Sequence, residues 1–288
     1  MTTEELIAAR RAEPWREALR KSKKNKERTD IPRVEMNELD AEYRSHTRLE
    51  EVNLGLTKEQ AMQEAQRCLD CPNPTCMQGC PVSINIPTFV KNIERGEFLE
   101  AARVLKETSA LPAVCGRVCP QEKQCESKCI HLKMGKPAVA IGYLERFAAD
   151  YERESGNISI PEVAEKNGIK IAVVGSGPAG LSFAGDMAKR GYDVTVFEAL
   201  HEIGGVLKYG IPEFRLPNKI VDVEIEGLRK MGVKFMTNCI VGKTISYDDL
   251  HADGFKGIFA ASGAGLPNFM NIPGENLVGV MSSNEYLT

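Results

Sequence analysis

Eight of the nine cysteines in this 288-residue chain stand in two dense groups. The first group is Cys68, Cys71, Cys76 and Cys80, and the second is Cys115, Cys119, Cys125 and Cys129. Cys80 and Cys119 are each followed directly by a proline. Closely spaced thiolates with such prolines are typical ligands of iron–sulfur clusters. The pattern therefore predicts a chain that carries single electrons.

Zinc and disulfides are the rival interpretations of these cysteines. Zinc sites also use closely spaced thiolates, but they commonly come as two well-separated Cys-x-x-Cys pairs. Here the segment from Cys68 to Cys80 holds four thiols in a single run, which favours iron–sulfur clusters. The ninth thiol, Cys239, stands alone and is interpreted as a buried strand residue.

Composition and charge limit which cell compartment and which classes of binding partner we expect. The start of the chain, Met1–Glu5, is polar and does not resemble a signal peptide. We therefore expect a cytoplasmic protein, whose clustered thiols stay reduced rather than form disulfides. A net charge of −3 gives no case for nucleic acid or an anionic membrane as partner. No stretch is long and apolar enough to predict a transmembrane helix.

Four regions are predicted along the chain: a charged N-terminal arm at 1–40, an all-α [4Fe-4S]-binding domain at 41–155, a linker at 156–168 and a Rossmann-like FAD/NAD(P)-binding domain at 169–288. The arm carries nine basic residues between Arg10 and Arg28, around a single tryptophan, Trp15. It is interpreted as a solvated helix or loose arm. The alternative is an arm that grips a partner subunit, with Trp15 as its anchor.

Local signals predict helices in the cysteine-rich region. Thr57 and Gln60 have the spacing of a capping box, so a helix is predicted to begin there and to deliver Cys68 at its end. A second amphipathic helix is predicted over about 139–152. Cys125 and the cysteine four residues later are expected to share one face of a short helix. No strand pattern precedes residue 165, and this half is therefore predicted to be all-α.

A second motif follows the linker. An apolar strand leads into Gly175-Ser-Gly177-Pro-Ala-Gly180, a helical pattern follows, and the next strand ends in Glu198. In this arrangement the glycines allow a tight turn and a close approach to a pyrophosphate, and the acid accepts hydrogen bonds from ribose hydroxyls. The residues predicted to bind the dinucleotide are Gly175, Gly177, Pro178, Ala179, Gly180 and Glu198.

Together these cysteine runs resemble the N-terminal domain of the glutamate synthase small (beta) subunit family. A similar domain opens dihydropyrimidine dehydrogenase and the large subunit of NADH-dependent ferredoxin:NADP oxidoreductase. The resemblance covers roughly residues 50–288. It implies an α-helical ferredoxin-type domain followed by a flavin domain.

The resemblance also implies which side chains hold two [4Fe-4S] clusters. The implied ligands are Cys68, Cys71, Cys76 and Cys129 for one cluster, and Cys80, Cys119, Cys125 and Glu145 for the other. Cys115 is then a non-ligand. Spacing alone does not assign the thiols, and Cys115 is the chemical rival of Glu145, because a thiolate binds iron more readily than a carboxylate. Glu145 is otherwise interpreted as a surface salt-bridge residue.

A glycine-rich stretch at 201–217 resembles the segment that passes along the flavin in this family, and 258–265 resembles the strand and turn that return to it. The stretch at 201–217 is otherwise interpreted as a turn plus a loop. The resemblance adds Gly204, Gly205, Leu207, Arg215 and Gly263 to the expected FAD-binding residues. The family's NADPH-binding domain has no counterpart here, so we expect a fragment whose NADPH site lies in the missing part.

The implied function is electron transfer from NADPH through FAD to the clusters, with no side chain needed as acid or base. The expected partner is the large catalytic subunit of a glutamate synthase. The alternative is a ferredoxin:NADP oxidoreductase, whose small flavin and iron–sulfur reductase subunit would be the partner. A non-catalytic cluster carrier or interaction fragment, and a colourless zinc module, are the hypotheses from other classes.

Overall fold

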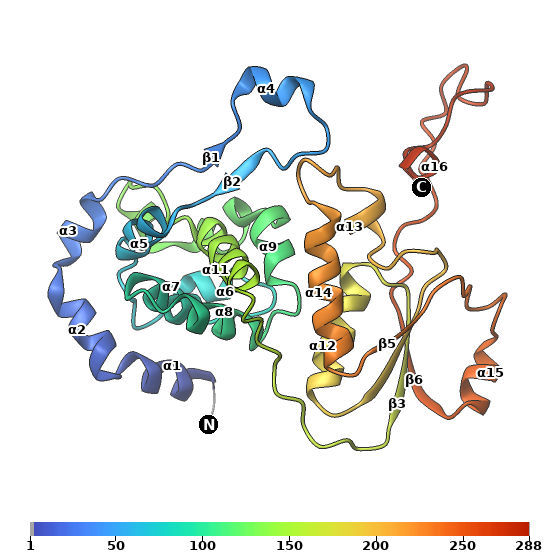
Figure 1. The fold of residues 1–288 in the computed structure, drawn as a ribbon, viewed down its shortest axis with the longest axis horizontal. Helices are drawn as coiled ribbons and strands as arrows, with labels where there is room; N and C mark the ends of the chain where they lie inside the picture. The colour runs from blue at the N-terminus through green and yellow to red at the C-terminus, as the bar shows by residue number, and fades with distance from the viewer. Residues whose placement is uncertain (1–2, 288) are drawn as a thin grey trace. The chain divides into compact units, whose positions relative to one another are not determined.

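The computed structural model describes residues 3–287. The chain forms two compact units, one that ends at Pro161 and one that begins at Glu162 (Figure 1). The first unit contains the two cysteine groups, and the second contains the glycine-rich loop. In the described part of the chain, no helix combines the length and the apolar character needed to cross a lipid bilayer.

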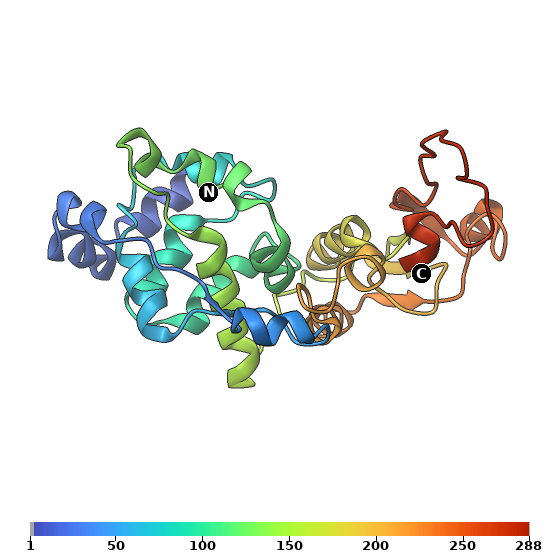
Figure 2. The same ribbon diagram turned by 90° about the horizontal axis from the view of Figure 1, so that it is seen from above.

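The first unit is built mainly from short helices (Figure 1 and Figure 2). They are α1 (Thr3–Arg11), α2 (Pro14–Ser22), α3 (Asn25–Asp30), α4 (Ala41–His46), α5 (Lys58–Gln66), α6 (Thr75–Gln78), α7 (Ile86–Glu94), α8 (Phe98–Lys106), α9 (Pro112–Val118), α10 (Ile130–Lys133) and α11 (Ile141–Ser155). Two 3-10 turns, Gln121–Lys123 and Glu126–Lys128, lie between α9 and α10. Helix α11 passes through the middle of the unit and packs against α8 and α9.

The capping box predicted at the start of α5 is confirmed. The Gln60 amide donates to Thr57 Oγ1 at 3.2 Å, and the Thr57 amide donates to Gln60 Oε1 at 2.8 Å. These bonds satisfy N–H groups that a helix leaves unpaired at its first turn. The predicted helix at 139–152 is also present, as α11, and it ends before Gly156, which adopts a left-handed φ of 73°.

Apolar side chains from three helices form the core of the first unit. Phe89 of α7, Leu105 of α8 and Leu144 of α11 are completely buried. Phe98 and Phe147 pack edge to face with ring centroids 5.0 Å apart. Burial of each such side chain contributes about 1.5–3 kcal/mol to the free energy of unfolding. This packing fixes α11, the helix that carries one of the expected cluster ligands.

The prediction that this half is all-α is wrong in one place. Strand β1 (Asn37–Glu38) pairs antiparallel with β2 (Asn53–Gly55). The amide of Asn37 supports the pair, because Nδ2 donates to the carbonyl oxygen of Gly55 at 2.9 Å. Strands of two or three residues are too short to show an alternating pattern, and their pairing depends on residues far apart in sequence.

The expectation of a solvated N-terminal arm is wrong for α2 and α3. Arg16 of α2 and Arg28 of α3 are each only 1% exposed. They pair with the buried carboxylates of Asp70 and Glu94. Trp15 contacts the same chain, since the Arg95 guanidinium lies 3.8 Å from the centre of its ring. The basic run therefore packs as part of the first unit.

The second unit contains a four-stranded parallel sheet. Its strands are β3 (Lys170–Val174), β4 (Asp193–Phe197), β5 (Lys234–Met236) and β6 (Phe255–Ala260). Its helices are α12 (Pro178–Lys189), α13 (Val206–Tyr209), α14 (Asn218–Lys230), α15 (Tyr247–Ala252) and α16 (Ser283–Leu287). Helix α12 packs against β3, β4 and α14, whereas α15 contacts β6.

The strand order β5-β4-β3-β6 positions the ligand site of this sheet. The chain moves outward from β3 to β4 and β5, then returns to β6 on the other side of β3. In open parallel sheets, ligands bind beyond the carboxyl ends of the strands where the order reverses. The loop after β3, which carries the glycine motif, lies at this point.

Asp150 of α11 lies at the centre of a partly buried ion network. Its carboxylate accepts hydrogen bonds from Arg117 at 2.8 Å and from Arg146 at 3.2 Å, and it pairs with Arg153. Burial alone would raise the pKa of Asp150, but the guanidinium groups outweigh burial and hold it below the ordinary value. Because the folded-state pKa is depressed, this carboxylate stabilises the fold above the unfolded-state pKa of about 4.

We expect Asp150→Asn to lower the free energy of unfolding by about 3 kcal/mol at pH 7, because buried guanidinium groups lose their counter-charge. The wild-type advantage should shrink as the pH falls through the depressed pKa of Asp150, which urea denaturation at a series of pH values would measure. Asp186→Asn removes a half-exposed carboxylate on α12 and should cost less than about 0.5 kcal/mol. A difference between wild type and Asp150→Asn that stays constant down to about pH 2 would contradict this account.

Candidate iron–sulfur and dinucleotide sites

Four cysteines from different segments line one cavity in the first unit. They are Cys68, Cys71, Cys76 and Cys129. Cys68 follows α5, Cys76 lies in α6, and Cys129 precedes α10, so three helices position the set. Ile86, Val90 and Ile141 supply apolar walls. A donor set of four soft thiols in an apolar cavity fits the ligand chemistry of a [4Fe-4S] cluster.

Burial raises the pKa of three of these thiols. It raises the pKa of Cys68 to about 11 and, together with the nearby Cys68, Cys129 and Cys71 thiols, raises the pKa of Cys76 further. The pKa of Cys71 is raised for the same reasons, burial first and Cys129 next. Metal ligands must be deprotonated, so iron bound by these thiols would displace their protons.

A second set gathers around α11. Cys80, Cys119 and Cys125 share this region with Glu145, whose side chain is 5% exposed. Burial raises the pKa of Cys125 to about 12, and the next largest cause is the charge of Glu145. The pKa of Cys80 is also raised, first by burial and further by Glu145 and Cys119. Glu145 is thus a buried neighbour of these thiols and does not lie on the surface.

Cys115 accompanies the second set through a hydrogen bond with Cys119. This bond raises the pKa of Cys115 well above the ordinary value and lowers the pKa of Cys119 to about 7. The bond joins the two side chains directly. Cys115 therefore lies beside Cys119 as a hydrogen-bonding neighbour.

The prediction that Cys125 and Cys129 share one helical face is wrong. A 3-10 turn, Glu126–Lys128, separates them, and Cys129 has an extended backbone. Cys129 therefore lies in the first set, and Cys125 lies in the second. Cys239 is buried as predicted, but it follows β5 rather than lying in a strand.

All nine cysteines are free thiols. Within residues 3–287, no group of three or more His, Cys, Asp or Glu side chains is arranged to hold a single metal ion. A cubane differs from a single ion in that its thiolates bind separate irons around a shared cage.

The glycine-rich loop of the second unit joins β3 directly to α12. A Cβ atom at Gly175 would lie 2.3 Å from the carbonyl oxygen of Ala261, and Gly175 has a φ of 102°. A Cβ at Gly180 would lie 2.0 Å from the carbonyl oxygen of Gly175. By contrast, a Cβ at Gly177 would meet no atom within 4 Å. Two glycines thus allow close packing, and the third leaves open space at the N-terminus of α12.

That open space fits the phosphates of a dinucleotide. Gly177 is the N-cap of α12, a 12-residue helix whose first N–H groups and dipole favour an anion. Pro178 and Ala179 form the exposed first turn. A phosphate group placed against this turn would therefore approach the backbone without a side chain in the way.

Glu198 is tied to the loop at the end of β4. Its Oε2 accepts a hydrogen bond from the Ser176 amide at 2.9 Å and another from the Ser176 hydroxyl. Its Oε1 accepts from the Leu200 amide at 2.9 Å. The carboxylate is 7% exposed and is held beside the fingerprint loop, where a ribose would lie.

Two of the residues expected from the flavin segment lie against this loop. The Gly204 amide donates to Ser176 Oγ at 3.0 Å, and a Cβ at Gly205 would lie 2.9 Å from the Gly177 Cα. Gly263 follows β6, beside the segment that contacts Gly175. Leu207 is buried at 2% exposure, whereas Arg215 is exposed.

Two residues with a place at these sites were not predicted from the sequence. Ser176 joins Glu198 to Gly204, but its position in the motif is the variable one and carries no signal. His131 belongs to no motif in the sequence, yet it is fully buried on the wall of the first cysteine cavity. Its Nε2 donates to the carbonyl oxygen of Arg67 at 3.0 Å.

Two family models match the chain. Residues 44–157 match the model described as dihydropyrimidine dehydrogenase domain II, 4Fe-4S cluster. Residues 173–231 match the model described as an NAD(P)-binding Rossmann-like domain. A 4Fe-4S domain therefore precedes a Rossmann-like dinucleotide-binding domain, which places the chain in the class of iron–sulfur oxidoreductases.

Curated relatives narrow this class. The chain is 39% identical to the NAD-dependent dihydropyrimidine dehydrogenase subunit PreT of Escherichia coli K12, over 77% of this chain and 54% of PreT. It is 37% identical to the glutamate synthase [NADPH] small chain of the same strain, over 79% of this chain and 48% of that protein. For the Azospirillum brasilense small chain the identity is 33%, over 83% of this chain and 49% of the relative.

The resemblance to the glutamate synthase small-chain family is thereby confirmed, and the relatives are NAD(P)H-dependent oxidoreductases. The chain spans about half the length of these curated relatives.

Proposed function

We propose that this chain is the electron-transferring part of an NAD(P)H-dependent oxidoreductase, with FAD on the second unit and two [4Fe-4S] clusters in the first. The observation that carries the proposal is the division of the clustered cysteines into two neighbouring sets, on a chain that also has a dinucleotide-binding fold. When bound, these cofactors together convert a two-electron hydride into single-electron transfers. The protein supplies position and shielding from solvent.

For the first cluster we propose Cys68, Cys71, Cys76 and Cys129 as ligands, because all four line one apolar cavity. For the second we propose Cys80, Cys119, Cys125 and Glu145, because Glu145 is buried among these thiols. The hydrogen bond between Cys115 and Cys119 supports a role for Cys115 as a neighbour of a ligand sulfur. Such neighbours tune a metal site without binding the metal.

We expect Glu145→Ala to lose about half of the iron of the reconstituted chain, because the second cluster loses a ligand. Glu145→Gln should retain most of it, since an amide oxygen occupies the same place. Iron analysis and electron paramagnetic resonance spectroscopy of the reduced proteins would measure both effects. Full iron content in Glu145→Ala would instead assign the fourth position to Cys115.

For the second unit we propose FAD as the dinucleotide. Gly177 leaves room for the pyrophosphate, and Glu198 lies where ribose hydroxyls would be bound. Gly204 and Gly205 bring a second glycine-rich segment against the same loop, as the resemblance to the flavin segment implies.

The curated relatives suggest two partner subunits, and the resemblance found in the sequence adds a third. We propose the large catalytic subunit of a glutamate synthase, on the resemblance to the glutamate synthase small chain. The second candidate is the partner of a PreT-type dihydropyrimidine dehydrogenase subunit, favoured by 39% identity to PreT over 77% of this chain. The small reductase subunit of a ferredoxin:NADP oxidoreductase remains the alternative. The site of action is proposed to be the cytoplasm.

A reductive titration tests the proposed function. The chain would be reconstituted anaerobically with iron, sulfide and FAD, then titrated with dithionite while flavin absorbance and cluster spectra are recorded. We expect about four electron equivalents per chain, two for the flavin and one for each cluster. A protein that binds zinc alone, or clusters that accept no electrons, would overturn the proposal.

A further inference from the structure

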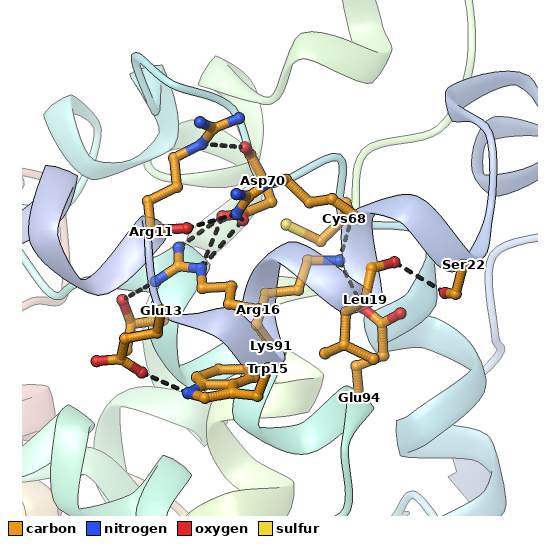
Figure 3. Close-up of polar contacts among 12 residues, drawn as sticks. Arg11, Glu13, Trp15, Arg16, Leu19, Ser22, Cys68, Asp70, Lys91 and Glu94 are labelled. Carbon is orange, nitrogen blue, oxygen red and sulfur yellow. Dashed lines mark hydrogen bonds and ion pairs between the residues drawn. The ribbon is translucent and has the colours of Figure 1, made fainter.

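Arg16 of helix α2 is a buried cation that contacts the loop between Cys68 and Cys71. The Arg16 guanidinium contacts the Asp70 carboxylate through Nη2 at 2.5 Å and Nε at 3.0 Å (Figure 3). Its Nη1 donates to Thr88 Oγ1 at 2.7 Å. Both members of this ion pair are almost fully removed from solvent, with side-chain exposures of 1% and 0%.

Asp70 is the residue of this loop that most needs support. It adopts a φ of 52°, a left-handed conformation that is uncommon for a residue other than glycine. Arg20 donates a further hydrogen bond to Asp70 Oδ2 at 2.7 Å, and Arg11 Nε donates to the Asp70 carbonyl oxygen at 2.9 Å. Three guanidinium groups from α1 and α2 therefore hold one residue between two proposed cluster ligands.

A second buried cation reaches the same loop from α7. Lys91 is completely buried, and its Nζ donates to the carbonyl oxygen of Cys68 at 2.6 Å (Figure 3). Lys91 also pairs with Glu94, which accepts a further hydrogen bond from Arg28 of α3 at 2.8 Å. The Asp70 carboxylate is thus shared by two arginines, and the Glu94 carboxylate is shared by Lys91 and Arg28. Positive charge is therefore in excess beside the loop.

We propose that α1, α2 and α3 form a positioning clamp for the Cys68–Cys71 loop, and that the buried cations of this clamp raise the reduction potential of the cluster held there. The inference rests on the proposed function, because it requires a cluster on these cysteines. Reduction adds negative charge to a cluster, and a cation in a region of low dielectric stabilises that charge strongly. Net charge, hydrogen bonding and exposure are the protein's means of setting cluster potentials.

The clamp lies outside residues 44–157, which match the 4Fe-4S family model. Arg16 of α2 is buried, whereas Lys21 of the same helix is 75% exposed and pairs with Glu17. This contrast provides a matched control, since Lys21→Met removes the same charge from α2 without touching the loop.

The test is a redox titration of the full chain, reconstituted anaerobically and followed by electron paramagnetic resonance. For Arg16→Met we expect one cluster to become harder to reduce, by at least about tenfold in its reduced-to-oxidised ratio, which is 59 mV for one electron. The other cluster should be unchanged. Arg16→Lys keeps the charge and should keep most of the potential, and Lys21→Met should shift neither cluster.

If Arg16→Met does not fold, Arg20→Met provides the same test, because Arg20 is 21% exposed and easier to replace. It should lower the potential of the same cluster by a smaller amount. Unchanged reduction potentials in these variants, or equal shifts of both clusters, would overturn the inference. If the wild type still holds two clusters, that result leaves the proposed function intact. A wild-type chain that holds no cluster would overturn both.

Discussion

Cys76→Ser is expected to remove about half of the iron of the reconstituted chain, from about eight irons to about four. Cys76 lines the first cavity together with the other three thiols of its set. A serine hydroxyl is a harder and much less acidic ligand than a thiol, so it replaces a thiolate poorly on iron. Iron and acid-labile sulfide analysis would measure the loss, and spectroscopy should show one remaining cluster.

Cys115→Ser is the matched control within the cysteine-rich unit. It removes a thiol that is hydrogen-bonded to Cys119, and we expect it to keep nearly all of the iron. Cys239→Ser, in the second unit, should also keep the full amount. If Cys115→Ser emptied a cluster, the proposed assignment of ligands would be wrong, and Glu145 would lose its place in the second set.

Gly177→Val should lower the affinity for FAD by at least about 100-fold, while the chain remains folded. A Cβ atom at this position meets no atom of the protein within 4 Å, and Gly177 has an ordinary φ of −65°. The added side chain would, however, fill the space in which the pyrophosphate approaches the N-terminus of α12. Flavin content after gel filtration would measure binding, and thermal unfolding would show that the fold is retained.

Two other glycines give contrasting controls. Gly227→Ala in α14 also meets no atom within 4 Å, and it should keep FAD and add about 0.5–1 kcal/mol of stability. Gly180→Ala would place a Cβ 2.0 Å from the carbonyl oxygen of Gly175, so it should damage both folding and flavin binding. Normal FAD affinity in Gly177→Val would show that the dinucleotide lies elsewhere.

Local sequence signals predicted the parts of the fold that depend on neighbouring residues. The capping box of Thr57 and Gln60 and the parallel sheet around the glycine motif are of this kind, because spacing alone encodes them. The pairing of β1 with β2 was missed, since it joins short segments with no pattern of their own. Cys125 and Cys129 were misplaced because helical spacing does not reveal a 3-10 turn.

The N-terminal arm shows what a charge pattern leaves open. A run of basic residues predicts a solvated surface unless carboxylates elsewhere reach it. Here Asp70 lies 54 residues from Arg16, and Glu94 lies 66 residues from Arg28. Such distant pairs determine whether a cation is buried, and they have no signature in a single sequence.

The central claim is that the two cysteine sets hold iron–sulfur clusters beside a flavin-binding fold. Metal, sulfide and flavin analysis of anaerobically purified protein, with Mössbauer spectroscopy of the iron, tests this most directly. The account predicts about eight irons and about eight sulfides per chain, all in [4Fe-4S] form, together with FAD. Stoichiometric zinc in place of iron, or a reconstituted chain that holds no metal, would contradict it.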